Sequence, residues 1–305
     1  MANVHRIGDY QNNGQGGNYY QMGNQESQLN MGRLQQMRVP FITSGNRYQG
    51  DPRKETFPQM LKLNLCPSLK LFSFTIFIIL LNVLIFVSMC TQGINKQGQL
   101  LEIRIDVLDE FGANNAQKIQ QKYQLWRLFT AMFLHLNFIH ILFNSVSAFI
   151  LVSVMEYTYG TLYVIIIYIL SGIGGNLFTD MFSSVIIISA GASTSLMGML
   201  ALFVSYMVLN WKSLEFTGQL RCMFVCITTI IIIWVFLLSS GFSTKSGVDN
   251  FGHLGGFITG LLAGICIPKP FQQTDYEMKA KFISGGLLAF FLGLMLILFY
   301  TVVKL

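Results

Sequence analysis

Residues 157–179 read YTYGTLYVIIIYILSGIGGNLFT and contain no Asp, Glu, Lys or Arg. An α-helix needs about 20 apolar residues to cross the hydrocarbon core of a bilayer, so this stretch predicts a membrane-spanning helix. Further stretches free of these charged residues are 71–95, 128–155, 181–211, 222–244, 250–268 and 282–303. The sequence therefore predicts an all-α, polytopic transmembrane helix bundle with seven spans.

The composition of the 305-residue chain excludes several classes of protein. Only 11% of its residues are charged and 52% are hydrophobic, whereas an ordinary soluble domain has about 25% charged residues. So few charges cannot cover a soluble globule, which argues against a cytosolic enzyme, a nucleic-acid module and a disordered scaffold. The five cysteines form no CxxC pair and mostly lie in or beside apolar stretches. We therefore expect no disulfide framework, no metal site and no cofactor.

The basic residues of the chain predict its orientation. With a cytoplasmic N-terminus, the cytoplasmic segments hold 13 Lys and Arg residues and the opposite side holds 7. Cytoplasmic segments of membrane proteins carry such an excess, so the net charge of +6 needs no nucleic-acid partner. Residues 1–60 are rich in Gln, Asn and Gly, and we expect them to form a disordered cytoplasmic tail. The start of the chain does not look like a signal peptide, so residues 71–95 would act as an internal anchor.

Polar residues near the starts of three stretches are candidates for chemistry. They are His135, His140 and Asn144 in the second stretch, Ser193 in the fourth and His253 in the sixth. Alternate helices run in the same direction, so these side chains should lie at similar depth and can meet in one site. Ionisable groups inside a membrane are costly and often functional. A set of structural interhelical hydrogen bonds is the alternative.

Glycines at positions 252, 256, 260 and 264 recur every four residues. This spacing places them on one helix face, where a neighbouring helix can approach closely. We therefore expect the sixth predicted helix, which is short, to lie inside the bundle.

The segments WRLFTAMFLHLNFIHILFN (126–144), GASTSLMG (191–198) and DNFGHLGGFITG (249–260) resemble, in order and spacing, the rhomboid family of intramembrane serine proteases. The resemblance covers roughly Trp126 to Gly264. It implies a rhomboid-like six-helix catalytic core over residues 61–267. It further implies a linker and seventh helix over residues 268–305, as in the eukaryotic secretase-type arrangement.

By this resemblance, Ser193 is the nucleophile and His253 is its general base. A serine hydroxyl is a weak nucleophile at neutral pH, and an imidazole that takes its proton activates it. His140 and Asn144 would stabilise the oxyanion. The supporting motif residues are Trp126, Arg127, Gly191, Gly256 and Gly260. The chain departs from the family pattern at Thr194, where glycine is usual, and at Met197, where many members have an aromatic residue.

The resemblance implies a serine-type endopeptidase that cleaves single-pass transmembrane substrates in or near their membrane helix. The host bilayer would be a Golgi, endosomal or plasma membrane. The alternative is a weakly active or inactive rhomboid-like protein that binds and escorts membrane clients. The retained Ser193 and His253, and Ala192 in place of a proline, favour the enzyme. A transporter with His135 and His140 as a proton relay ranks lower, because the chain lacks internal repeats and has few acidic residues in its helices.

Overall fold

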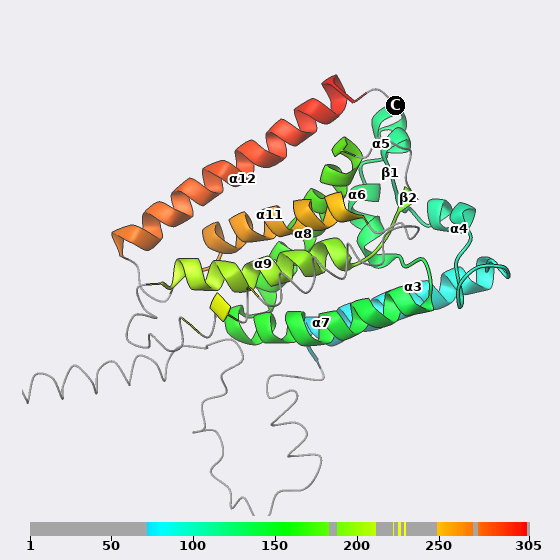
Figure 1. The fold of residues 1–305 in the computed structure, drawn as a ribbon, viewed down its shortest axis with the longest axis horizontal. Helices are drawn as coiled ribbons and strands as arrows, with labels where there is room; N and C mark the ends of the chain where they lie inside the picture. Colours follow the sequence, from blue (N-terminus) through cyan, green and yellow to red (C-terminus); the bar gives the residue numbers. More distant parts are fainter. Residues whose placement is uncertain are drawn as a thin grey trace, which may run out of the picture. The chain divides into compact units, whose positions relative to one another are not determined.

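A computed structural model describes residues 72–182, 188–211, 249–270 and 274–303, together with residues 222, 225, 226 and 229. The predicted tail, residues 1–60, lies outside the described residues, and so does nearly all of the predicted span 222–244. The described part is an all-α bundle of the kind expected for a multi-pass membrane protein (Figure 1).

Among the described residues, four helices are long and apolar enough to cross a membrane. They are α3 (Phe74–Gln92), α7 (Phe138–Tyr159), α8 (Thr161–Phe182) and α12 (Asp275–Thr301). Two shorter apolar helices, α9 (Ser193–Leu209) and α11 (Asn250–Cys266), have 17 residues each. Six of the seven predicted spans therefore contain a helix among the described residues.

Two predicted spans start too early. The span predicted from residue 128 becomes helix α7 only at Phe138, where the Asn137 side chain caps the helix by accepting from the His140 backbone N–H at 2.8 Å. The span predicted from residue 181 becomes helix α9 only at Ser193, since residues 181–182 end α8. Apolar loop residues precede both helices, and hydropathy does not distinguish them from helix.

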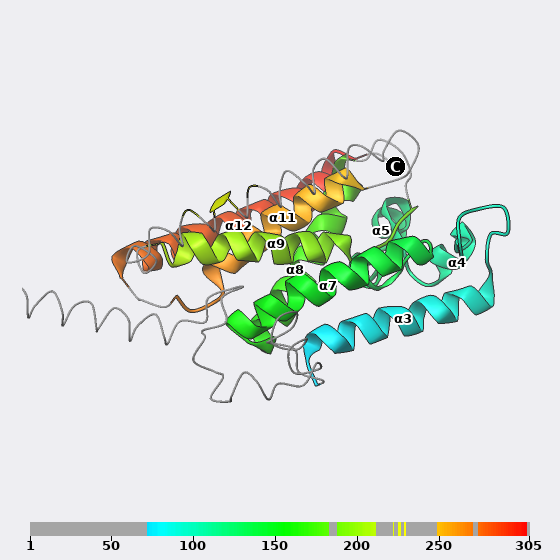
Figure 2. The same cartoon turned by 60° about the horizontal axis from the view of Figure 1, so that its bottom comes forward.

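Helix α11 packs inside the bundle against α9, α8 and α12, as its glycines predict (Figures 1 and 2). A Cβ atom on Gly260 would lie 2.4 Å from the Gly198 Cα of α9, and one on Gly264 would lie 2.5 Å from Ser205 Oγ. Real Cβ atoms do not approach other atoms so closely. Only glycine therefore lets the two helices cross at this distance.

The segment between α3 and α7 folds over one end of the bundle. It contains α4 (Ile105–Glu110), β1 (Asn114–Asn115), α5 (Ala116–Lys122), α6 (Arg127–Thr130) and the 3-10 turn η3 (Ala131–Phe133). Strand β1 pairs antiparallel with β2 (Ile188–Ser189), with Asn114 opposite Ser189. We call residues 93–137 the connecting loop. The bundle end that it covers is also where α7, α9 and α11 begin.

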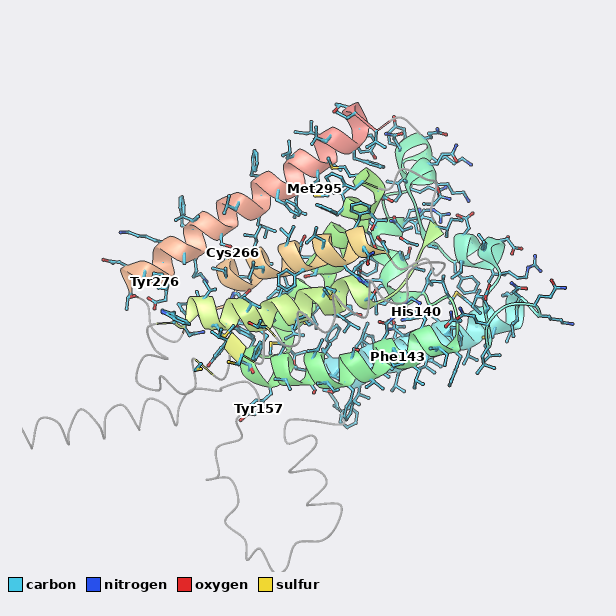
Figure 3. All side chains as sticks on the ribbon, in the orientation of Figure 1. His140, Phe143, Tyr157, Cys266, Tyr276 and Met295 are labelled. Atoms are coloured by element: carbon cyan, nitrogen blue, oxygen red, sulfur yellow. The ribbon has the colours of Figure 1, made fainter. Side chains whose placement is uncertain are left out.

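Helix α12 ends at the connecting loop. Gln120 Nε2 of α5 donates to the carbonyl oxygens of Phe299, at 2.7 Å, and Val303, at 2.6 Å. Phe299 and Met295 are buried in one apolar cluster with Ile119, and Figure 3 shows Met295 on the side of α12 that faces the bundle. The last helix thus supports the loop.

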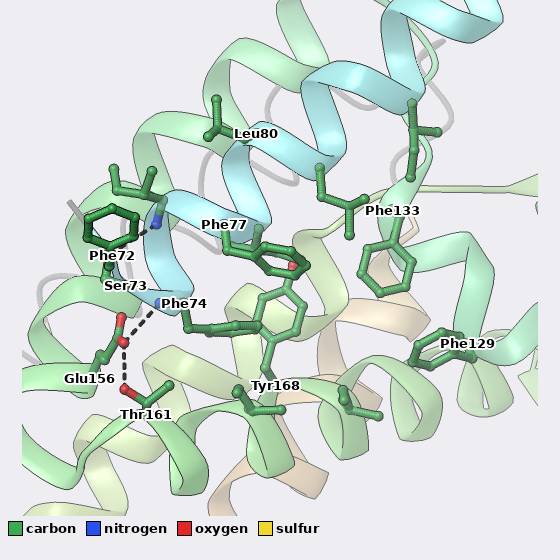
Figure 4. A pocket seen from close by; sticks show the side chains of 16 residues that line it. Phe72, Ser73, Phe74, Phe77, Leu80, Phe129, Phe133, Glu156, Thr161 and Tyr168 are labelled. Atoms are coloured by element: carbon green, nitrogen blue, oxygen red, sulfur yellow. Dashed lines mark hydrogen bonds between the residues drawn. The ribbon is translucent and has the colours of Figure 1, made fainter. Parts of the chain in front are cut away.

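An apolar pocket of about 900 Å³ lies between α3, α8 and the α6–η3 turn (Figure 4). Phe77, Phe129 and Phe133 line it, and none of the candidate site residues does. At its polar edge, the Glu156 carboxylate accepts from the backbone N–H groups of Phe74, at 2.9 Å, and Thr75, at 3.1 Å. This carboxylate ties the start of α3 to the end of α7.

Candidate active site

The candidate residues lie in the first turns of three helices that start at the same end of the bundle. His140 is the third residue of α7, Ser193 is the first residue of α9, and His253 is the fourth residue of α11. Figure 3 shows His140 beside the N-terminal end of α9. Ser193, His140 and His253 are all half-buried.

Gly191 brings His140 and Ser193 together. A Cβ atom on Gly191 would lie 3.0 Å from His140 Nε2 and 3.4 Å from Ser193 Oγ, so the two side chains flank one point. The Gly191 N–H donates to the Ala131 carbonyl oxygen at 3.0 Å, which fixes this turn against the connecting loop. Gly191 also has a φ of +155°, a conformation open to glycine but rarely to other residues. Both the backbone conformation and the space at position 191 therefore require glycine.

Two buried side-chain nitrogen atoms of the candidate residues lack hydrogen-bond partners among the described residues. Asn144 is only 7% exposed, and its Nδ2 has no hydrogen-bond partner among the described residues. His253 Nδ1 is likewise buried without a partner there. The His140 imidazole interacts electrostatically with that of His253. Buried polar groups are normally hydrogen-bonded, so these two nitrogen atoms have hydrogen-bonding capacity that the described residues do not use.

His135, the third candidate histidine of the membrane region, lies in the connecting loop and is fully buried. Its ring packs edge-on against His140, with 5.2 Å between the ring centroids. His135 therefore contacts the imidazole ring of His140 from the connecting loop. Neither ring nitrogen of His135 has a partner among the described residues.

The start of α11 meets the start of α9 through backbone contacts. A Cβ atom on Gly256 would lie 2.2 Å from the Thr194 carbonyl oxygen. On α8, a Cβ atom on Gly175 would lie 2.6 Å from the Gly252 carbonyl oxygen and 2.9 Å from Thr194 Cβ. Thr194 and Gly252 are the chain neighbours of Ser193 and His253, so the first turns of α9 and α11 that carry the two candidate residues lie next to each other and to α8. No hydrogen bond joins Ser193 Oγ to His253 within the described part of the chain.

The two departures from the family pattern have different surroundings. Thr194 is 4% exposed and occupies the junction of α8, α9 and α11 described above. Its Oγ1 has no partner among the described residues. Met197 is half-buried on the next turn of α9. The bulk of Thr194 therefore lies in the helix interface.

Trp126 and Arg127 organise the connecting loop. The Arg127 side chain is buried and its Nη1 donates to the carbonyl oxygens of Asp109, at 2.9 Å, and Ala113, at 2.8 Å. Its guanidinium lies 4.9 Å from the centre of the Trp126 ring. A Cβ atom on Gly112 would lie 2.3 Å from this ring. Trp126 and Arg127 thus contact other residues of the connecting loop, and their role is to stabilise the fold of that loop.

Asp109 carries the charge that balances Arg127. Partial burial opposes ionisation, but the hydrogen bond from Lys118 and the charge of Arg127 hold the pKa of the Asp109 carboxyl below its ordinary value. No cluster of three or more His, Cys, Asp or Glu side chains that could hold a metal ion occurs among the described residues.

Sequence reasoning assigned no role to two residues beside the site. Asp249 Oδ1 accepts from the Gly252 backbone N–H at 2.8 Å, and its Oδ2 accepts from Thr179 Oγ1 of α8 at 2.5 Å. An Asp immediately before a predicted helix, four residues from a candidate histidine, is the sequence signal that could have identified it. Nothing in the sequence pairs it with Thr179, which is 70 residues away.

A family model described as the rhomboid domain matches residues 122–270, which contain every candidate residue named above. This part of the chain belongs to the rhomboid family. It is 33% identical over 169 residues to RHOMBOID-like protein 1 of Arabidopsis thaliana, covering 55% of this chain and 41% of the relative.

Two further rhomboid relatives are named as proteases. The chain is 35% identical over 167 residues to Rhomboid-like protease 3 of Toxoplasma gondii, covering 52% of this chain and 60% of the relative. It is 30% identical over 186 residues to Rhomboid-like protease 1 of the same organism, covering 60% and 61%. This rhomboid thus spans about half the length of the curated relatives it matches.

Proposed function

We propose that this rhomboid is an intramembrane serine endopeptidase that cuts membrane-anchored proteins with a Ser193–His253 dyad. The observation that carries the proposal is the convergence at Gly191 of His140 and the Ser193 hydroxyl, at the first turn of α9. The unpaired Asn144 amide supplies a second donor in the same region. A nucleophile surrounded by unused donors is the arrangement that acyl transfer requires.

In the first step, Ser193 Oγ attacks the carbonyl carbon of the scissile peptide while His253 takes the hydroxyl proton. The carbonyl π electrons move to oxygen and form a tetrahedral oxyanion. In this mechanism the Ser193 backbone N–H, Asn144 Nδ2 and the His140 imidazole would donate to this oxyanion. The free N–H groups at the start of α9 add a favourable electrostatic field.

The C–N bond then breaks as His253 returns the proton to the leaving amine, which leaves an acyl ester on Ser193. A water molecule attacks this ester with His253 again acting as the base. The acyl product leaves as a carboxylic acid, and Ser193 regains its proton. The cycle needs only water as co-reactant.

The length of the site helices supports a reaction close to the membrane surface. A helix of 17 residues extends about 26 Å, compared with about 30 Å for the hydrocarbon core. Ser193 and His253 would therefore start slightly below one membrane surface, where water can still enter. The excess of basic residues favours a cytoplasmic N-terminus, which places the site toward the opposite leaflet.

This orientation has a direct test. A glycosylation acceptor inserted near residue 115 should be modified in a Golgi, endosomal or plasma-membrane protein, and one inserted near residue 20 should not. The reverse pattern would place the site in the cytoplasmic leaflet.

The substrates that fit the proposal are single-pass proteins whose membrane helix unwinds locally. Unwinding is needed because the carbonyl groups of an intact helix are hydrogen-bonded and shielded from attack.

The nucleophile can be tested without knowing the physiological substrate. A fluorophosphonate probe should label the detergent-purified protein, and Ser193→Ala should abolish labelling. Ser195→Ala is the matched control, because Ser195 lies two residues along the same helix with its Oγ directed at Met132 Sδ, 3.7 Å away. Equal labelling of parent and Ser193→Ala would show that the reactive nucleophile lies elsewhere and contradict the proposal, whereas no labelling of the parent would favour a client-binding role.

A further inference from the structure

Asp249 connects the start of α11 to α8 through both of its carboxylate oxygens. Oδ1 accepts from the Gly252 N–H at 2.8 Å, and Oδ2 accepts from Thr179 Oγ1 at 2.5 Å. The backbone carbonyl of Asp249 also accepts from the His253 N–H at 3.0 Å. One residue thus holds the turn that carries His253 and ties it to a neighbouring helix.

The surroundings leave this connection little freedom. Thr179 is 3% exposed. A Cβ atom on Gly252 would lie 2.6 Å from Asp249 Oδ2 and 2.7 Å from Thr179 Oγ1. A larger residue than glycine at position 252 would therefore collide with the contact between the Asp249 carboxylate and the Thr179 hydroxyl. A change at any of the three residues would shift the first turn of α11.

The carboxylate also acts on His253 through its charge. Asp249 interacts electrostatically with the His253 imidazole, which lies one helical turn further along. The other titratable groups that face this pair are His140 of α7, which interacts with His253, and Asp180 of α8, which interacts with Asp249.

Asp249 accepts more hydrogen bonds than Asp180. The Gly252 N–H and the Thr179 hydroxyl donate to the Asp249 carboxylate, which lies at the N-terminus of α11. Asp180 is 2% exposed and its Oδ2 has no partner among the described residues, while Asn114 donates to its Oδ1 at 2.8 Å.

We propose that Asp249 is a positioning residue for the general base: it fixes the first turn of α11 against α8, and its charge stabilises the imidazolium that His253 becomes when Ser193 loses its proton. This inference rests on the proposed dyad. Asp249 makes no contact with the reacting atoms in this account and acts entirely through His253. The carboxylate is not a hydrogen-bonded triad member, because His253 Nδ1 has no partner among the described residues.

The experiment compares Asp249→Asn, Asp249→Ser and Thr179→Val in proteoliposomes with a single-pass reporter substrate. Asp249→Asn removes the charge at constant size, Asp249→Ser keeps a capping oxygen if the amide variant folds poorly, and Thr179→Val removes the link but keeps the charge. Asp275→Asn is the matched control, since Asp275 is exposed at the start of α12.

We expect Asp249→Asn and Asp249→Ser to lower kcat about tenfold with little change in KM, as loss of an electrostatic contribution to the transition state does. A nearby anion stabilises the protonated imidazole, and the base works only when neutral. Removing the anion should therefore move the acidic limb of the kcat profile to lower pH, by about one unit. Thr179→Val should lower kcat and thermal stability but leave the limb in place.

A second readout does not depend on proteolysis. In a Ser193→Ala background, the NMR titration of ¹⁵N-labelled His253 should have its midpoint at lower pH in Asp249→Asn than with Asp249 intact. The His253→Gln spectrum assigns the signal. An unchanged midpoint, or an unchanged kcat profile in an active protein, would overturn the inference. A shifted midpoint without any proteolysis would overturn the proposed function alone.

Discussion

Gly256 of α11 and Thr194 of α9 meet so closely that a Cβ atom on Gly256 would lie 2.2 Å from the Thr194 carbonyl oxygen. This contact lies one turn after His253 and one residue after Ser193. The backbones of the two helices therefore set the spacing of the proposed dyad.

Gly256→Val should separate α11 from α9 and abolish most cleavage. Overpacking of this kind typically costs about 1–3 kcal/mol of stability, and the displacement separates His253 from Ser193. Cleavage of a reporter substrate and the thermal unfolding midpoint are the measurements. Ile258→Val, a smaller change at a half-buried position of the same helix, is the control. Parental activity in Gly256→Val would show that the close contact is not needed.

The oxyanion donors should differ from the nucleophile in the size of their effect. Loss of one such donor typically costs about 100- to 1,000-fold in kcat in soluble serine proteases. Because three donors would share the charge in the proposed mechanism, we expect Asn144→Ala to retain measurable activity and His140→Ala to lose more. His140 also contacts His135, and its loss would disturb the connecting loop. If both single variants matched the parent in kcat, the two residues would be structural hydrogen-bonding groups.

Gln120 should stabilise the protein by attaching the connecting loop to the end of α12. It donates to two carbonyl oxygens there, and each such bond contributes about 0.5–1.5 kcal/mol. Gln120→Leu should lower the thermal unfolding midpoint and speed proteolysis of the connecting loop. Gln97→Leu, at an exposed position of the same loop, serves as the control. Equal midpoints in the two variants would mean that α12 does not support the loop.

Asp109 should make the connecting loop acid-sensitive. Its pKa in the folded state is lowered by Lys118 and Arg127, against partial burial. A carboxyl with a lowered pKa contributes stability that is complete above its unfolded pKa of about 4 and is lost as pH falls through the folded value. Asp109→Asn should therefore flatten the decrease in thermal stability below about pH 4. An unchanged pH dependence in this variant would assign the acid sensitivity to other carboxyls.

The sequence predicted where six membrane helices lie, but a charged residue did not always mark their ends. Helix α12 begins at Asp275, seven residues before the predicted span, and α7 continues past Glu156 to Tyr159. The end of α8 and the burial of α11 followed from charge-free stretches and glycine spacing. The starts of α7 and α9 did not, because residues before Phe138 and Ser193 are apolar but belong to the connecting loop and strand β2. A capping residue such as Asn137, and not hydropathy, marks those boundaries.

Only those residues of the candidate site that belong to a local sequence motif could be predicted. Ser193, His253, His140 and Asn144 were identified from local patterns, and the structure places them at one end of the bundle. Asp249 and Thr179, and likewise Asn114 and Asp180, are pairs that lie more than 60 residues apart in the chain. Each pair is formed by tertiary packing, so no local sequence pattern predicts it. Glu156 was passed over because it ends a charge-free stretch, although it links α3 to α7.

The central claim is that Ser193 and His253 cut a peptide bond of a membrane-embedded substrate. The most direct measurement is cleavage of a labelled single-pass reporter by the purified protein in proteoliposomes, with mass spectrometry of both fragments. We predict cleavage in or near the reporter's membrane helix by the parent and by Ser195→Ala. Neither Ser193→Ala nor His253→Ala should cut the reporter, while both should fold and insert like the parent. Cleavage at the same bond by Ser193→Ala would contradict the account.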